Sequence, residues 1–168
     1  LHRAKDKSFI FGSGARVFEN LDKGHQYSDL LISSVRGPLT RDFLMKRKKI
    51  NTPEIYGDPC LLISKFYKPK TIFKLKNKIG VIPHQRHFKK YAQKIDTQKF
   101  FLIDSRLKWE EVIDYIYSCK AIISSNLYGL ICSDSYQKPN IWIDDFKLDK
   151  RDFEFRDYFA SQKRKYQK

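Results

Sequence analysis

The sequence contains no apolar run of about 18 residues, the length that a membrane-spanning helix needs. Its amino terminus, residues 1–7, is polar and lacks the apolar core of a signal peptide. The first residue is not methionine, so we expect the chain to be a fragment of a longer protein. Together these absences predict a cytoplasmic protein that reaches a membrane only peripherally, at its inner face.

Cysteine is scarce, and the three cysteines (Cys60, Cys119 and Cys132) are widely spaced. None of them forms a CxxC pair or a Cys/His cluster with the spacing of a zinc site. Cys119 and Cys132 stand in apolar surroundings, where a free thiol packs like a small hydrophobic side chain. The cysteines therefore predict a reduced setting, and no metal site or cofactor is expected.

Acidic residues are missing from Lys65 to Lys90, which holds nine lysines and arginines, and the whole chain has a net charge of +15. Such charge attracts nucleic acid, anionic lipid or a phosphorylated small molecule. Two interpretations stay open for this stretch: it attracts an anionic ligand or membrane, or it is only a lysine-rich, solvated surface. No helix-turn-helix, RRM or zinc-finger pattern is present, so no specific nucleic acid is expected. A basic module for nucleic acid or polyanions remains an alternative.

Short apolar runs recur along the chain and alternate with helical stretches. The clearest helix has Trp109, Val112, Ile113 and Ile116 at the spacing i, i+3, i+4, i+7. Other helices are expected from Pro38, where the missing N–H is tolerated, and over residues 129–136. The expected strands are residues 9–11, 30–35, 78–84, 100–104, 121–125 and 140–144.

Continuous apolar strands that alternate with helices are typical of a parallel sheet covered on both faces. The sequence thus predicts an α/β fold with a doubly wound, mostly parallel sheet of about six strands. Residues 1–144 are expected to form the domain, and residues 145–168 a basic, aromatic tail that is helical. Ligands of such sheets bind beyond the carboxyl ends of the strands, so the loops there are the candidate sites.

Two of these loops come early in the chain. Gly12, Ser13, Gly14 and Arg16 follow the first strand, and glycines allow a ligand to approach exposed backbone N–H groups. An ordinary strand-to-helix turn is the alternative. Arg36 follows the second strand just before a helix begins, and both a guanidinium and a helix N-terminus suit phosphate or carboxylate.

Two later loops also carry candidate residues. His84 ends the third strand, where it could act as acid, base or phosphate donor, or be a structural histidine. After the fifth strand come Asn126, Leu127, Tyr128 and Gly129, which build a helix N-terminus suited to an anion. A simple capping turn with a packed tyrosine is the alternative there.

Five segments in this order resemble the polysaccharide pyruvyltransferase family. They read GSGAR, SVRGPLTRDFL, YGDPCLLISKFY, IGVIPH and ISSNLYGLICSDSYQKPNIWID, and the resemblance runs from about Phe9 to Asp144. Family members resemble two-lobed glycosyltransferases of the B type. The resemblance implies that this chain is the Rossmann-like C-terminal lobe, and that the N-terminal lobe, where the sugar acceptor is expected to bind, is missing.

The resemblance also implies a reaction. The family transfers a pyruvyl group from phosphoenolpyruvate to two hydroxyls of one sugar, as a cyclic ketal, in the synthesis of exopolysaccharides and other cell-surface polysaccharides. The implied partners are phosphoenolpyruvate as donor and a lipid-linked or polymeric sugar as acceptor, whereas peripheral contact with an anionic membrane is expected from the basic charge. No step requires a metal ion or a cofactor.

Site residues follow from the matching segments. Arg36 matches the donor-binding arginine, and Asn126, Leu127 and Tyr128 match a Ser/Arg-Leu-His segment, so Tyr128 stands where the family has histidine. A phenol is a far weaker acid than imidazolium near neutral pH. Three readings follow: Tyr128 donates instead, His84 supplies the acid, or the activity is altered or lost. A lobe that binds a nucleotide-sugar is a further alternative, although no acidic motif for a ribose is present.

Overall fold

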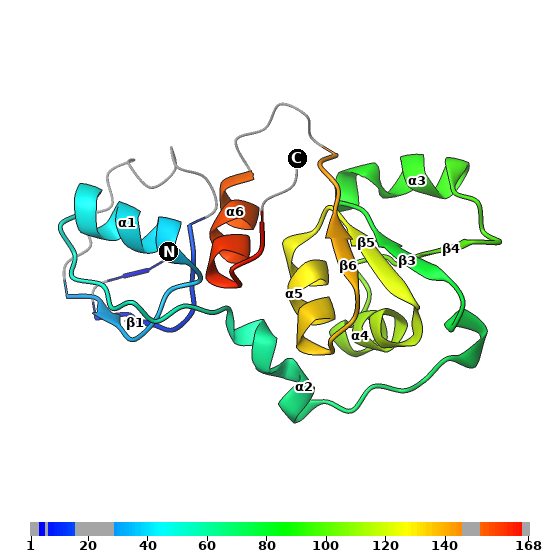
Figure 1. Cartoon of the computed structure of the whole chain (residues 1–168), viewed down its shortest axis with the longest axis horizontal. Coiled ribbons are helices and arrows are strands. Elements are labelled where there is room, and N and C mark those ends of the chain that lie inside the picture. The colour runs from blue at the N-terminus through cyan, green and yellow to red at the C-terminus, as the bar shows by residue number, and fades with distance from the viewer. Residues whose placement is uncertain (1–3, 6, 16–28, 146–151, 166–168) are drawn as a thin grey trace. The chain divides into compact units, whose positions relative to one another are not determined.

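The computed structural model describes residues 4–5, 7–15, 29–145 and 152–165 of the chain (Figure 1). The chain divides into two compact units. The first unit is built from both ends of the sequence, Leu1–Pro59 and Leu148–Lys168, and the second unit is Cys60–Lys147. Each unit has its own parallel sheet and its own apolar core.

A four-stranded parallel sheet forms the centre of the second unit. Its strand order is β4-β3-β5-β6, and the strands are β3 (Ile79–Ile82), β4 (Phe100–Leu102), β5 (Ala121–Ser124) and β6 (Asn140–Trp142). The register pairs Gly80 with both Phe101 and Ile122, and Ser124 with Trp142. Because all four strands are parallel, the loops that follow them emerge at the same edge of the sheet.

One face of this sheet carries the apolar core of the second unit. The helices α4 (Trp109–Ser118) and α5 (Leu127–Ser135) cover this face, and α4 buries Ile113 and Ile116, as its spacing predicts. A Cβ at Gly80 would lie 2.7 Å from Ile122 Cδ1, so any larger residue would force the core side chains around it to shift. The core joins Leu75, Ile82, Ile103, Ile116, Cys119 and Ile122.

The other face of the sheet is covered by the short helix α3 (Phe88–Lys94), which lies on the side opposite to α4 (Figure 1). Successive side chains of a strand point to opposite faces, so Val81 and Ile123 point toward α3. They line a hollow of about 560 Å³, together with Tyr91 and Lys94 of α3. The two faces of the sheet are therefore packed very differently.

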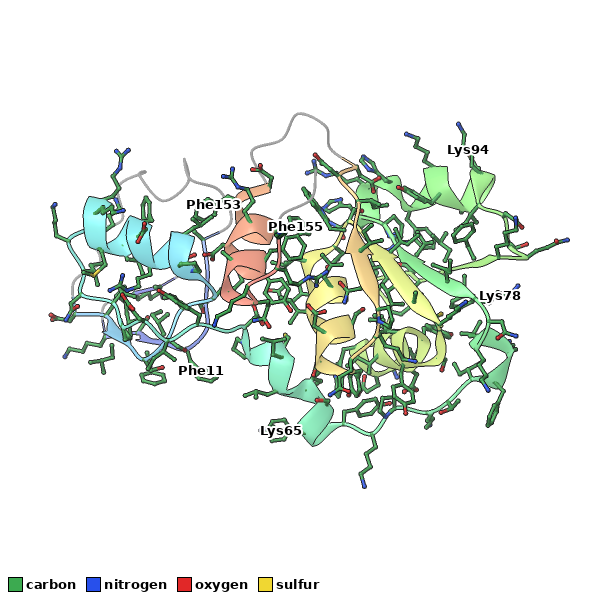
Figure 2. The ribbon with its side chains drawn as sticks, in the orientation of Figure 1. Phe11, Lys65, Lys78, Lys94, Phe153 and Phe155 are labelled. Carbon is green, nitrogen blue, oxygen red and sulfur yellow. The ribbon has the colours of Figure 1, made fainter. Side chains whose placement is uncertain are left out.

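The first unit has a small parallel sheet of β1 (Phe9–Ile10) and β2 (Leu31–Ile32). Helix α1 (Pro38–Arg47) begins at the proline, as expected, and packs against α6 (Asp152–Ser161), which comes from the far end of the chain. Figure 2 labels Phe153, the residue through which α6 joins the core of this unit. The other members of that core are Ala15, Val35, Phe43 and Leu44.

The expected α/β fold with mostly parallel strands is confirmed. All six expected strands form, although they are shorter than expected and lie in two sheets rather than one. A long connection separates β2 from β3, and it contains α1, the 3₁₀ helix η2 (Pro59–Leu62), α2 (Ile63–Phe66) and the 3₁₀ helix η3 (Phe73–Leu75). Helix α5 begins at Leu127, slightly before the expected start. Within the described ranges, no helix has the length and apolarity to cross a membrane.

Candidate functional site

The glycine loop after β1 folds against its own unit. Gly12 has a φ of 66°, and its N–H donates to the carbonyl oxygen of Ser34 at 3.0 Å and to Ser34 Oγ at 2.9 Å. Ser13 forms a bridge with Val35. A Cβ at Gly14 would lie 2.4 Å from the Arg36 guanidinium carbon. Of the predicted residues, Gly14 thus gives Arg36 room to approach the loop, Gly12 and Ser13 join the loop to Ser34 and Val35, and Arg16 lies outside the described residues.

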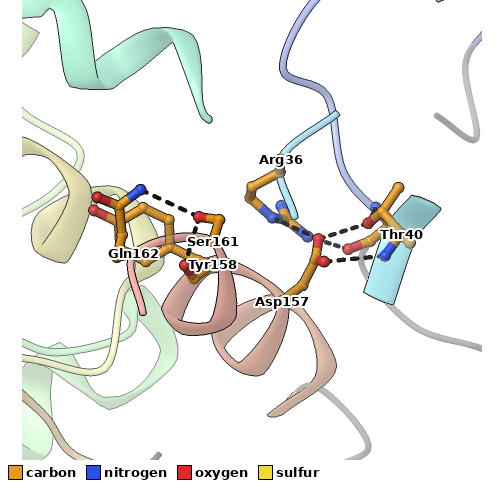
Figure 3. A network of polar contacts seen from close by, with 7 residues as sticks. Arg36, Thr40, Asp157, Tyr158, Ser161 and Gln162 are labelled. Carbon is orange, nitrogen blue, oxygen red and sulfur yellow. Dashed lines mark hydrogen bonds and ion pairs between the residues drawn. The ribbon is translucent and has the colours of Figure 1, made fainter. Parts of the chain in front are cut away.

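Arg36 is buried, with 5% of its surface exposed, and Figure 3 shows what it faces. Its Nε lies 3.4 Å from Oδ2 of Asp157 on α6, and its Nη2 donates to the carbonyl oxygen of Ala15. Nε makes no hydrogen bond to any described residue, so its contact with Asp157 is purely ionic. The guanidinium is therefore directed at groups of its own unit.

Asp157 connects Arg36 to the start of α1. It is fully buried, and its carboxylate accepts hydrogen bonds from Thr40 N at 3.0 Å and from Thr40 Oγ1 at 2.6 Å (Figure 3). Gly37, the N-cap residue of α1, has no side chain to cap the helix, so Asp157 does so from another element. Burial raises the pKa of Asp157 above its ordinary value, while the Thr40 hydrogen bonds and Arg36 act in the opposite direction.

The loop after β5 forms a second helix N-terminus, in the second unit. Asn126 caps α5: its Oδ1 accepts from Tyr128 N at 3.0 Å and from Gly129 N at 3.4 Å. Leu127 is buried, whereas 58% of the Tyr128 surface is exposed. The first amides of this helix are thus satisfied by a neutral side chain, and the phenol of Tyr128 is left accessible to solvent.

Tyr128 borders a pocket of about 280 Å³ between β3, α4 and the start of α5. Asn126 and Gly129 contribute to its wall beside Tyr128, at the carboxyl end of the sheet. Apart from Ser105, apolar and aromatic side chains form the rest of the wall, Trp109 among them. The remaining lining residues are Cys60, Ile82, Ser105, Leu107, Val112, Ile113, Ile116 and Cys132. A phenol hydroxyl beside an apolar pocket can orient a small polar ligand by hydrogen bonding.

His84 lies at the same edge of the sheet, after β3. Its backbone N–H donates to Ser125 Oγ at 2.8 Å, which ties the β3 loop to the β5 loop. Its Nδ1 accepts from Arg86 N at 3.3 Å and so caps the 3₁₀ helix η4 (Gln85–His87). With Nδ1 accepting, a neutral imidazole carries its proton on Nε2.

Asp145, just after β6, joins these loops and was not predicted. Its carboxylate accepts from Ser125 Oγ at 2.6 Å and from the Tyr91 hydroxyl at 2.5 Å, and it lies 3.6 Å from Nδ1 of His87. Burial, followed by this hydrogen bond, raises the pKa of Tyr91, so its hydroxyl stays a donor. The network ties together the edge of the sheet from which the candidate loops emerge.

The predicted residues therefore fall into two groups. Gly12, Ser13, Gly14 and Arg36 belong to the first unit, and His84 and the Asn126–Gly129 loop belong to the second. Sequence reasoning missed the partners Asp157 and Asp145. Asp157 had two signals in the sequence: it stands among the aromatic residues of a predicted helix, and the family resemblance continues weakly into the Asp157–Tyr158 region. Within the described part of the chain, no three His, Cys, Asp or Glu side chains are arranged to hold a metal ion.

Comparison with known proteins identifies the family. The family model described as "Polysaccharide pyruvyl transferase" matches residues 1–145. The chain is 28% identical over 146 residues to "Uncharacterized protein L143" of Acanthamoeba polyphaga mimivirus. That alignment covers 75% of this chain and 46% of the viral protein, so the chain spans about half the length of that relative. No solved structure matches the present chain. Because the family model spans most of the sequence, the chain belongs to the polysaccharide pyruvyl transferase family.

Proposed function

We propose that this chain is the donor-binding part of an enzyme that transfers a pyruvyl group from phosphoenolpyruvate to a sugar, as a ketal, during surface polysaccharide synthesis. Family membership supports the class of reaction. The observation that carries the proposal for the site is the exposed Tyr128 phenol beside the pocket at the start of α5. Tyr128 stands where the resemblance expects the family's histidine.

The proposed reaction sets clear requirements for the site. A proton is added to the methylene carbon of phosphoenolpyruvate, and the neighbouring carbon becomes an electrophile. One sugar hydroxyl attacks this carbon, phosphate leaves, and the second hydroxyl closes the ketal. Of the two protons lost by the sugar, one balances the proton added to the methylene carbon and the other leaves with phosphate. The site must therefore hold a phosphate and a carboxylate and must supply a proton.

Tyr128 and His84 divide these tasks in our proposal. The Tyr128 hydroxyl donates a hydrogen bond to the donor's phosphate beside the start of α5, where the helix dipole favours an anion. His84, on the neighbouring loop, supplies the proton as imidazolium, a stronger acid than a phenol at neutral pH; to form it, Nδ1 takes up a proton and gives up its contact with Arg86 N. Asn126, Leu127 and Gly129 position Tyr128 through the cap and through packing on the sheet.

The role of Arg36 and the glycine loop in donor binding stays a prediction, because these residues belong to the first unit and Tyr128 belongs to the second. The buried ion pair of Arg36 with Asp157 complicates any test, because Arg36→Ala would leave Asp157 buried without its counter-charge. Loss of binding in that variant would not distinguish ligand contact from misfolding. Arg36→Lys is the better variant, since it keeps the charge and removes the planar fork that binds phosphate or carboxylate with two hydrogen bonds.

Calorimetric titration of the chain with phosphoenolpyruvate tests the proposal. Tyr128→Phe should weaken binding roughly tenfold, as expected for the loss of a hydrogen bond to a charged group. The matched control is Tyr117→Phe, the same change at a partly exposed tyrosine of α4 outside the pocket lining. The proposed site is wrong if Tyr128→Phe binds as tightly as the parent chain, or if the control loses as much affinity.

A lobe that binds a nucleotide-sugar is the second candidate. The aromatic side chains of Trp109 and Tyr128 at the pocket favour it, because a base can stack on an aromatic ring. Competition between phosphoenolpyruvate and uridine diphosphate separates the two candidates. If full-length protein binds phosphoenolpyruvate but releases no phosphate in the presence of acceptor, the reading in which activity is lost is correct.

A further inference from the structure

Residues 62–76, here called the basic aromatic segment, expose apolar side chains among positive charges. Phe66 is 81% exposed and Phe73 is 82% exposed, more than any other large apolar side chain among the described residues. Leu62 adds a third partly exposed side chain. A phenylalanine side chain has no polar atom that can form a hydrogen bond with water. Two exposed phenylalanines on one short segment therefore indicate a contact with an apolar environment.

The segment is held in place although residues 67–72, between α2 and η3, form no regular element. Tyr67 OH and the backbone N–H of Lys70 both donate to Oδ1 of Asp114 on α4, at 2.9 Å and 2.8 Å. Ile72 N donates to Ser118 Oγ at 2.8 Å, one turn further along α4. The edge of the Tyr67 ring meets Trp109, with ring centroids 5.1 Å apart. These contacts fix the backbone of the segment.

The same contacts explain why the phenylalanines point outward. The side chains of Tyr67, Ile72 and Leu75 face the interior of the second unit, and Leu75 belongs to its core. Phe66 and Phe73 are each next to one of these inward residues, so their side chains are directed to solvent. Because the backbone is already ordered, docking these side chains on a partner costs little further conformational entropy.

The charge of the segment is of one sign. Its five lysines, all exposed, are Lys65, Lys68, Lys70, Lys74 and Lys76. In the sequence no acidic residue stands between Asp58 and Asp96. Figure 2 shows Lys65 extending away from the ribbon at α2. Asp114, the acidic group beneath the segment, is buried and already accepts two hydrogen bonds from it.

We propose that the basic aromatic segment docks the protein on an anionic lipid bilayer. The lysines contact the anionic headgroups, and Phe66 and Phe73 enter the interface between headgroups and acyl chains. Single-stranded nucleic acid, the other polyanion that combines lysines with aromatic rings, is less favoured, because the segment contains no arginine and also exposes the aliphatic Leu62. The proposal is independent of which donor the protein binds.

Co-sedimentation of the chain with vesicles tests this inference. Vesicles of phosphatidylcholine with about a third phosphatidylserine should bind the chain, and pure phosphatidylcholine vesicles should bind it far more weakly. The double variant Phe66→Ser/Phe73→Ser should lose at least about tenfold in vesicle binding, since burial of apolar surface is removed. Its matched control is Phe9→Ser/Phe11→Ser, the same change at two exposed phenylalanines of the first unit.

A second pair of variants isolates the charge. Replacing Lys65, Lys68 and Lys74 by glutamine should reduce binding to the anionic vesicles at least about tenfold. The control replaces three exposed lysines outside the segment, Lys89, Lys90 and Lys99, by glutamine, with the same change in net charge. Fluorescence of Trp109 and Trp142, both in the second unit, checks the folding of the variants in that unit, and hydrogen exchange in α1 checks the folding of Phe9→Ser/Phe11→Ser.

Four outcomes would overturn the inference. Equal losses in the two lysine variants would mean that net charge alone binds the vesicles, and equal losses in the two phenylalanine variants would mean that the segment has no special role. Equal binding to neutral and anionic vesicles would remove the role of the lysines. If the phenylalanine variant keeps its vesicle binding but loses affinity for a single-stranded oligonucleotide, the partner is nucleic acid.

Discussion

Two of the helices that follow parallel strands, α1 and α5, carry candidate residues at their N-termini, and these two N-termini are capped in opposite ways. The start of α1 is capped by the carboxylate of Asp157, which α6 brings from the far end of the sequence. The start of α5 is capped by the amide side chain of its own neighbour, Asn126. The positive end of the α1 dipole therefore already faces a negative charge, whereas that of α5 faces a neutral group.

Arg36, just before α1, and Tyr128, at the start of α5, differ in the same way: the first already has a charged partner, and the second is exposed to solvent. Arg36 is 5% exposed and paired with Asp157, while Tyr128 is 58% exposed beside a pocket. An anion that approaches α1 must compete with a buried carboxylate, and one that approaches α5 need not. Of the two helix ends, that of α5 is thus better prepared to receive a ligand.

Removal of the charged cap should have the largest effect. Asp157→Ala leaves Arg36 buried without a counter-charge and the start of α1 uncapped, so we expect the first unit to lose about 3–5 kcal/mol of stability. Hydrogen exchange should show lost protection in α1 and α6, with β3 to β6 unchanged. Asp152→Ala, on the same helix but at an exposed pair, is the control and should cost under about 1 kcal/mol.

A smaller effect is expected at Thr40. Its Oγ1 donates a hydrogen bond to Asp157 and accepts one from Ala15 N at 3.0 Å. Thr40→Val removes both hydrogen bonds, from the buried Asp157 carboxylate and from the Ala15 N–H. We expect a loss of about 2 kcal/mol, measured by denaturant unfolding. In an Asp157→Ala background the same substitution should cost clearly less; equal costs would show that the two residues act independently.

The neutral cap of α5 should contribute less again. Asn126→Ala removes the acceptor for Tyr128 N and Gly129 N, and about 1 kcal/mol of stability should be lost from the second unit. Unfolding followed by Trp109 and Trp142 fluorescence measures this loss. Asn126→Asp provides the sharper comparison: it preserves the cap but places a negative charge at the helix end, so it should retain stability and weaken phosphoenolpyruvate binding.

Tyr128→Phe should have the smallest effect on stability. Because the side chain is mostly exposed, removal of its hydroxyl should change the unfolding free energy by under about 0.5 kcal/mol. Any loss of ligand affinity in this variant can then be attributed to the binding contact. A stability loss comparable with that of Asn126→Ala would instead mean that the hydroxyl has a structural role.

Local patterns predicted the regular parts of the fold well. The apolar runs located all six strands, and the i, i+3, i+4, i+7 spacing located α4. Helix α3 was missed although Phe88, Tyr91, Ala92 and Ile95 have the same i, i+3, i+4, i+7 spacing, because the helix is only 7 residues long and the residues between them are polar and basic. The loops with candidate residues were found because they follow strands, but neither the ion pair of Arg36 nor the network around Asp145 could be read from neighbouring residues.

The sequence by itself determined which segments become strands and helices, where the candidate loops lie and to which family the chain belongs, because these depend on residues close together in the chain. Only the tertiary structure decided that the strands divide between two sheets, that α6 returns to the first unit, and that Asp157 meets Arg36 across 120 residues of sequence. A charge from a distant element can satisfy a helix end or a guanidinium as fully as a neighbour can, and no local pattern records it.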